Sequence, residues 1–184
     1  MEEKSDINIA EDKKVKKKST MNEWIIDIAI VACIALFIWN FIGYGVWITS
    51  GSMIPTLGVK DRLIVTRVHD LQSLKEGDIV LFKQEQFKDD LLIKRLIGLP
   101  GDKIEIKDGV VFRNGEQLQE DYVKEKDHFN GVYEIPEGKY FFLGDNRPNS
   151  SDSREWENPY VDKSQIEGKA RLKYYPMNQF EVYK

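Results

Sequence analysis

The stretch LLIKRLIGLPGD occupies residues 91–102 and carries the pattern that decides the fold. Apart from one lysine and one arginine, its first seven residues are leucine or isoleucine, a composition typical of a strand in the interior of a sheet. Alternation along a strand places Lys94 on the same face as Leu92 and Leu96. The ordinary interpretation is a lysine whose apolar stem runs along the surface to solvent. The alternative is a buried lysine that takes part in catalysis.

Similar short runs recur on both sides of this stretch. They are rich in β-branched and aromatic residues: RLIVTRV (62–68), DIVLF (78–82), KIEIK (103–107), VVFRN (110–114), KYFFLG (139–144) and ARLKYY (170–175). Asp108-Gly109 lies between two of these runs and is a strong hairpin signal, and Asn114-Gly115 is a second turn signal. These features predict a mostly β domain, an antiparallel sheet or barrel without parallel β-α-β units.

A long apolar run precedes the predicted strands. Residues 24–48 read WIIDIAIVACIALFIWNFIGYGVWI, and as a helix they would span about 37 Å, against about 30 Å for the hydrocarbon core of a bilayer. Trp24 and Trp47 bracket the run, as interfacial anchors do. A buried core helix and a cleaved signal peptide are the alternatives, but the run is long for either and no small-x-small site follows it. We therefore predict a single N-terminal transmembrane signal-anchor helix over 24–48.

The residues before this run predict its orientation. Five lysines crowd against it within residues 13–18. Because lysines next to a membrane span favour the cytoplasmic side, the sequence predicts a cytoplasmic lysine-rich tail over 1–23 and an extracytoplasmic domain over 49–184.

Composition excludes several classes of function. The chain has 184 residues, a net charge of −4, one cysteine (Cys33) and two histidines. The charge argues against a nucleic-acid partner, and a lone cysteine excludes an intrachain disulfide or a cysteine-rich zinc site. We expect neither a metal nor another cofactor.

The segment SGSMIPT (50–56) offers a candidate nucleophile directly after the apolar run. Gly51 permits close approach of a substrate backbone, and Ser50 and Ser52 face the same side of an extended chain. A nucleophilic serine needs a base, and neither His69 nor His128 has a local context that suggests a triad.

A lysine can be that base, as in known Ser-Lys arrangements. An ordinary lysine has a pKa of about 10.4, so its neutral form costs about 4.6 kcal/mol at pH 7. Burial against apolar side chains disfavours the ammonium and lowers that cost. Lys94, between two leucines, is the candidate whose neutral amine could take a proton from Ser52.

A third cluster, GDNRPNSSDSR (144–154), is dense in turn formers and hydrogen-bonding groups. It is either a solvated turn or a polar brace beside an active site, in which acids and arginines pair and serines orient a neutral amine.

Four segments resemble, in order, the signature boxes of bacterial type I signal peptidases (leader peptidases). They are SGSMIPTL (50–57), GDIVLF (77–82), IKRLIGLPGD (93–102) and GDNRPNSSDSR (144–154), and IEGKA (166–170) is similar to the family's closing strand. The resemblance extends over about residues 24–175. The short region 103–143 and the single anchor suggest the small Gram-positive form.

The resemblance implies a role for each matching residue. Ser52 is the nucleophile and Lys94 the general base; Ser50, with the Ser52 backbone N–H, forms the oxyanion hole, and Ser150 orients the lysine. Asp145, Asp152 and Arg154 are implied structural ion-pair positions. We further hypothesise that apolar walls formed by Ile48, Met53 and Ile93 leave shallow pockets for small substrate residues.

The sequence thus predicts a membrane-bound serine endopeptidase that cleaves signal peptides from exported preproteins at the outer face of the cytoplasmic membrane. Its expected partners are those preproteins and the lipid bilayer. Two alternatives stay open. One is a catalytically silent, membrane-anchored interaction module in surface-protein (pilin) assembly, and the other is a soluble Ser-Lys self-cleaving transcriptional regulator.

Overall fold

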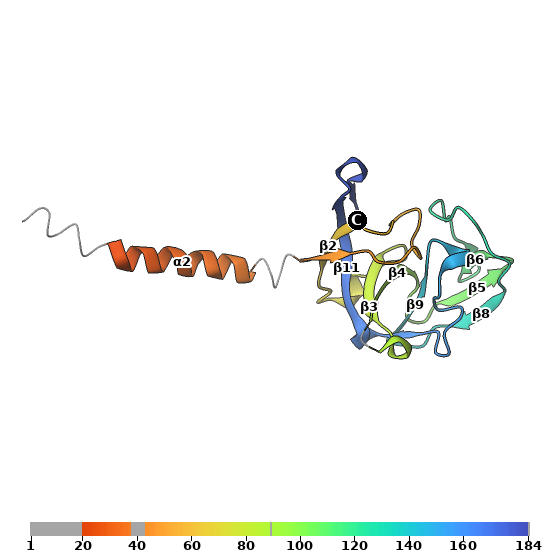
Figure 1. Cartoon of the computed structure of the whole chain (residues 1–184). Coiled ribbons are helices and arrows are strands. Elements are labelled where there is room, and N and C mark those ends of the chain that lie inside the picture. Colours follow the sequence, from red (N-terminus) through yellow and green to blue (C-terminus); the bar gives the residue numbers. More distant parts are fainter. Residues whose placement is uncertain (1–19, 38–42, 89, 184) are drawn as a thin grey trace, which may run out of the picture. The chain divides into compact units, whose positions relative to one another are not determined.

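The computed structural model describes residues 20–37, 43–88 and 90–183. The chain divides into two compact units, and the division falls between residues 42 and 43. Figure 1 draws both units along the chain. Residues 1–19 of the predicted tail over 1–23 lie outside the described residues.

The first unit contains one described helix, α2, over Thr20–Phe37. Its large apolar side chains are exposed: Trp24 is 70% and Val31 65% accessible, and Cys33 is also exposed. Within the described residues no helix has the length and hydropathy expected of a membrane span.

The predicted helix over 24–48 is wrong at its C-terminal end. Residues 38–42 lie outside the described residues, and Tyr44–Trp47 form strand β1, which pairs antiparallel with β2. The side chains of Tyr44 and Val46 pack against a buried core cluster, whereas Trp47 is 68% exposed. This alternation, with period two, makes the last part of the apolar run a strand.

The second unit consists of two antiparallel sheets (Figure 1). The larger sheet has the order β1 (Tyr44–Trp47), β2 (Arg62–Thr66), β11 (Ile166–Tyr175), β3 (Ile79–Lys83), β4 (Leu91–Gly98), β9 (Lys139–Leu143) and β10 (Val161–Asp162), with β12 (Glu181–Val182) paired to β11. The smaller sheet has the order β7 (Glu116–Gln117), β6 (Val110–Arg113), β5 (Lys103–Lys107) and β8 (Gly131–Glu134). Short 3-10 turns lie at Leu71–Ser73, Glu85–Phe87, Arg147–Asn149, Lys163–Gln165 and Met177–Gln179. The prediction of a mostly β, antiparallel domain is confirmed, and the described pairings form open sheets rather than a closed barrel.

Both predicted turns are confirmed. Asp108 and Gly109, with φ of 49° and 75°, join β5 to β6, and Asn114 and Gly115, with φ of 53° and 87°, join β6 to β7. Positive φ at both central residues is the geometry whose twist suits a two-residue hairpin.

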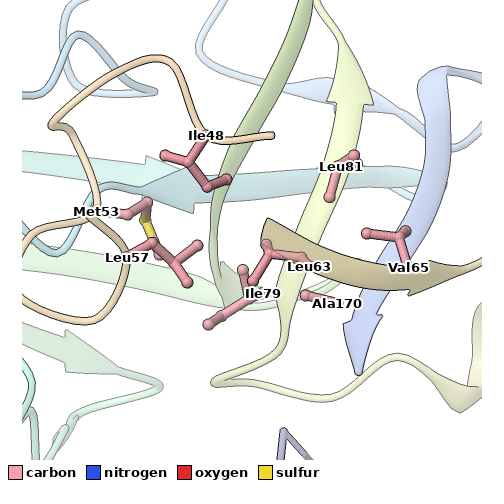
Figure 2. Close-up of a cluster of buried hydrophobic side chains, with 8 residues drawn as sticks. All are labelled: Ile48, Met53, Leu57, Leu63, Val65, Ile79, Leu81 and Ala170. Carbon is pink, nitrogen blue, oxygen red and sulfur yellow. The ribbon is translucent and has the colours of Figure 1, made fainter. Parts of the chain in front are cut away.

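The core cluster in Figure 2 fixes the chain on both sides of Ser52. It contains Ile48, Met53, Leu57, Leu63, Val65, Ile79, Leu81 and Ala170. The first three come from the segment after β1, and the others come from strands β2, β3 and β11. Because Ile48 and Met53 are both buried, the short loop between them has little freedom, and this loop carries Ser50 and Ser52.

Candidate active site

A cavity of about 330 Å³ opens between the segment that follows β1 and the start of β4. Ser50, Ser52 and Lys94 line it together with the apolar side chains of Ile48 and Ile93. The structure therefore brings together residues that lie more than forty positions apart in the sequence.

Ser52 is held from its backbone. The backbone N–H of Asn146 donates to the Ser52 carbonyl at 3.0 Å, and the Asn146 side-chain amide donates to the Gly51 carbonyl at 3.0 Å. The two hydroxyl oxygens of Ser50 and Ser52 lie 3.3 Å apart. With only 8% of its surface exposed, Ser52 presents its hydroxyl in a fixed place at the cavity wall.

Lys94 is 4% exposed, and its Nζ donates a hydrogen bond to Ser150 Oγ at 3.0 Å. Burial lowers its pKa from 10.5 to about 8, although the negative charge of Asp152 opposes this shift. At a pKa of about 8, roughly one lysine in ten is neutral at pH 7. Lys94 therefore has the protonation behaviour of a general base near neutral pH.

Gly144 permits the close approach of the two segments that carry the serines. A Cβ at this position would lie 2.1 Å from Ser150 Oγ and 2.5 Å from the Ser52 carbonyl oxygen. No side chain fits there. The Gly144 backbone N–H donates a hydrogen bond to Asp152 Oδ2 at 2.9 Å. This bond joins the start of the loop over 144–154 to a residue near its end.

The loop over 144–154 is braced by a buried ion pair. Arg154 contacts both carboxylate oxygens of Asp152, with Nε at 2.7 Å and Nη2 at 2.8 Å. Its Nη2 also donates to the carbonyls of Arg147 and Ser150. Arg154 and Asp152, the expected ion-pair residues, do pair, and the pair fixes the backbone that presents Ser150.

Asp145 has a partner that the sequence analysis missed. Arg95 donates to both of its carboxylate oxygens, from Nε at 2.8 Å and from Nη2 at 2.6 Å, and Thr56 Oγ1 donates at 2.5 Å. Arg95 follows Lys94 in β4, and alternation directs the two side chains to opposite faces. That adjacency indicates a cation on the face of β4 opposite to Lys94, but it does not indicate which carboxylate the cation contacts.

Two of the three residues that we hypothesised as walls of the substrate pockets lie at the cavity. Ile48 and Ile93 line the cavity. Met53 does not: it has no exposed surface and packs in the core cluster of Figure 2. Its position directly after Ser52 suggested a wall, but the loop turns there and directs the side chain inward.

Neither histidine is among the residues that line this cavity. His128 is exposed and pairs with Asp108, 2.6 Å away, which raises the pKa of the imidazole. Within the described residues no group of three His, Cys, Asp or Glu side chains could hold a metal ion.

The second unit is thus an antiparallel β domain in which a serine and a buried lysine, hydrogen-bonded to a hydroxyl, line one cavity. Residues 21–175 match the family model described as "Signal peptidase, peptidase S26". The chain belongs to this bacterial type I signal peptidase family.

Individual relatives agree. Signal peptidase I of Bacillus licheniformis is 35% identical over 183 residues, covering 93% of this chain and 97% of the relative. Signal peptidase IB of Staphylococcus aureus (strain Mu50 / ATCC 700699) is 34% identical over 184 residues, covering 89% and 94%. A crystal structure of a signal peptidase I from Enterococcus faecalis V583 is 32% identical, with a TM-score of 0.48, and covers 54% of this chain and 98% of that one.

Proposed function

We propose that this protein is a membrane-bound serine endopeptidase that cleaves N-terminal signal peptides from exported preproteins, with Ser52 as nucleophile and Lys94 as general base. The observation that carries the proposal is the state of Lys94. A lysine that is 4% exposed, bonded to a hydroxyl and with a pKa of about 8, lines the same cavity as a held serine. Family membership supports the substrate class, since the named relatives are signal peptidases.

The chemistry follows from the two groups. Neutral Lys94 takes the proton of Ser52 Oγ as that oxygen attacks the scissile carbonyl. The oxyanion that forms is stabilised by the Ser52 backbone N–H and by the Ser50 hydroxyl, which lies 3.3 Å from Ser52 Oγ. The Lys94 ammonium then protonates the departing amine, which leaves a Ser52 ester. Lys94, neutral again, takes a proton from a water molecule as that water attacks the ester, and returns the proton to Ser52 Oγ as the signal peptide leaves.

Two features support a membrane anchor. Large apolar side chains on successive turns of α2, such as Trp24, Ile28 and Val31, are all more than half exposed, and water is an unfavourable environment for such a surface. The lysines within residues 13–18 favour a cytoplasmic N-terminus. We place the domain from β1 onward outside the cytoplasm, where the cleavage sites of exported proteins emerge.

The observations disfavour the two alternatives. A silent interaction module has no need of a buried lysine, whose charged form destabilises the fold. A soluble self-cleaving regulator has no need of the exposed apolar helix.

The decisive experiment incubates the detergent-solubilised full chain with a purified preprotein and sequences the new N-terminus. We expect one cut after a small-x-small site by the wild type and none by Ser52→Ala or Lys94→Ala. A matched control is Ser151→Ala, next to Ser150 but exposed. Full activity in Lys94→Ala, with the variant folded by circular dichroism, would remove the Ser-Lys mechanism.

A further inference from the structure

The segment 120–127, here called the strap, follows the small sheet and packs against β4 and against the loop over 144–154, here called the catalytic loop. Three arginines contact the strap: Arg147 contacts Glu120, Arg95 contacts Tyr122, and Arg154 contacts Asp127. The first is a buried ion pair, with side chains 5% and 2% exposed. In the second, the guanidinium carbon lies 3.8 Å from the centre of the tyrosine ring. Because these contacts lie near both ends of the strap, they restrict the positions of the residues between them.

The three arginines all hold the loop that carries Ser150 and Asn146. Arg95 binds the Asp145 carboxylate, Arg154 binds Asp152, and Arg147 Nε donates to the Gly144 carbonyl at 3.0 Å. The strap is therefore fixed relative to Ser52, because the same loop binds the Ser52 carbonyl through Asn146.

A second cavity, of about 260 Å³, lies under the strap. It is lined by Lys124 and Glu125 of the strap, by Asn146 and Asn149 of the catalytic loop, and by Ile54 and Pro55. Ile54 and Pro55 follow Ser52 in the chain, whereas the first cavity is lined by the residues 46–50 that precede it. The two cavities thus lie against the two ends of the short segment that holds the nucleophile.

Lys124 and Glu125 are the charged groups of this cavity that remain available to a ligand. The third one, Asp145, is 1% exposed and already bound by Arg95. Lys124 makes only a long contact of 3.5 Å to the Asp121 carbonyl. In the part of the chain that the structure describes, neither Lys124 nor Glu125 takes part in an ion pair, and both are exposed.

We infer that the second cavity receives the first residues after the scissile bond, and that Lys124 and Glu125 select those residues by charge. This inference rests on the proposed function, because it takes Ser52 as the point where the bond is cut. A peptide in extended form advances about 3.3 Å per residue, so only the first few residues of the mature protein come within reach of the strap. Lys124 favours acidic side chains there and Glu125 favours basic ones.

The test uses detergent-solubilised full-length enzyme and a panel of preprotein peptides. All share one sequence up to the scissile bond and carry Glu, Gln or Lys at the second or third position after it. We expect Lys124→Glu to shift the ratio of kcat/KM values for the Glu and Lys peptides about five- to tenfold toward Lys, and Glu125→Lys to shift it as far toward Glu. Raising the salt to about 0.5 M should shrink both shifts, since exposed charges are screened.

Two controls separate this inference from the proposed function. Lys163→Glu makes the same change in net charge as Lys124→Glu, at a position that lines neither cavity, and should leave the ratio unchanged. The second control measures binding of the same labelled peptides to Ser52→Ala, in which the charge preference should persist without cleavage. Binding preferences that respond to Lys124 and Glu125, together with no cleavage of any peptide by the wild type, would uphold the subsite and overturn the peptidase function. Equal ratios in wild type, Lys124→Glu and Glu125→Lys, with cleavage intact, would overturn the subsite alone.

Discussion

Two buried lysines flank Val80 in one cross-strand row of the large sheet, Lys94 on β4 and Lys169 on β11. They are equally hidden, at 4% and 6% exposure. Lys169 pairs with the buried carboxylate of Asp78 at 2.6 Å, whereas Lys94, within the described residues, has the uncharged hydroxyl of Ser150 as its hydrogen-bond partner at 3.0 Å. The carboxylate of Asp78 thus makes Lys169 one half of a buried ion pair. The Ser150 hydroxyl carries no charge, and the charge of nearby Asp152 offsets only part of the burial cost, so burial lowers the pKa of Lys94 to about 8.

The largest expected effect separates the two lysines by activity. Lys94→Met should lower kcat/KM at least about 1000-fold, because removing the base of a cooperating pair disables the serine too. Lys169→Met should keep cleavage while the protein stays folded. The double variant Ser52→Ala, Lys94→Met should be no worse than either single variant. Single-turnover cleavage of one preprotein by all four variants measures this, and additive losses would separate the two residues.

The pH profile should carry the signature of Lys94. Its neutral form is the active one, so kcat/KM should fall about tenfold per pH unit below a midpoint near 8 and level off above it. Leu96→Thr, which makes the surroundings of the amine more polar, should raise this midpoint, since the ammonium is then less destabilised. Lys169→Met should leave the midpoint in place. A rate that is flat from pH 6 to 9 would exclude a titrating lysine base.

Ser150 should have an intermediate effect. Ser150→Ala removes the hydroxyl that Lys94 contacts and should lower kcat about 10- to 100-fold, with little change in KM, because only the orientation of the base is lost. Ser150→Thr retains a hydroxyl and tests rescue. Ser153→Ala is a matched control in the same loop, since Ser153 Oγ bonds the Phe142 backbone N–H. Equal kinetic losses in Ser150→Ala and Ser153→Ala would assign both to the loop fold.

The last effect is on stability, not on cleavage, and has opposite signs for the two lysines. Lys94→Met should raise the free energy of unfolding by about 2–3 kcal/mol at pH 7, because the unfolded lysine keeps its proton up to about pH 10.5 and the folded one only to about 8. The gain is complete below pH 8 and disappears as the pH rises toward 10.5. Lys169→Met should instead cost about 3 kcal/mol, since Asp78 is left buried and unpaired. Urea unfolding at pH 7 and pH 10 measures both.

Much of the domain could be predicted locally. The seven apolar runs all correspond to observed strands, because β-branched and aromatic residues between turn formers favour a pleated backbone. The sequence missed β1, since its four residues continue an apolar run and look like the end of a helix. It also missed β8, four residues long, and the two-residue strands β7, β10 and β12, all of which are short for a period to show.

The candidate site likewise contains features that the sequence predicted and features that it did not. Residue types and alternation made Ser52 and Lys94 candidates, and the family resemblance added Ser150; the structure places Ser52 and Lys94 at one cavity and Ser150 beside Lys94. The sequence could not identify the partner of Asp145, because Arg95 lies fifty positions away and only strand pairing brings the two together. Nor could it show that Met53 turns into the core or that Gly144 leaves no room for a side chain. The sequence by itself determines which side chains are present, but the pKa of a side chain depends on its burial and on its partners in the folded protein. For that reason only the tertiary structure distinguished Lys94 from Lys169.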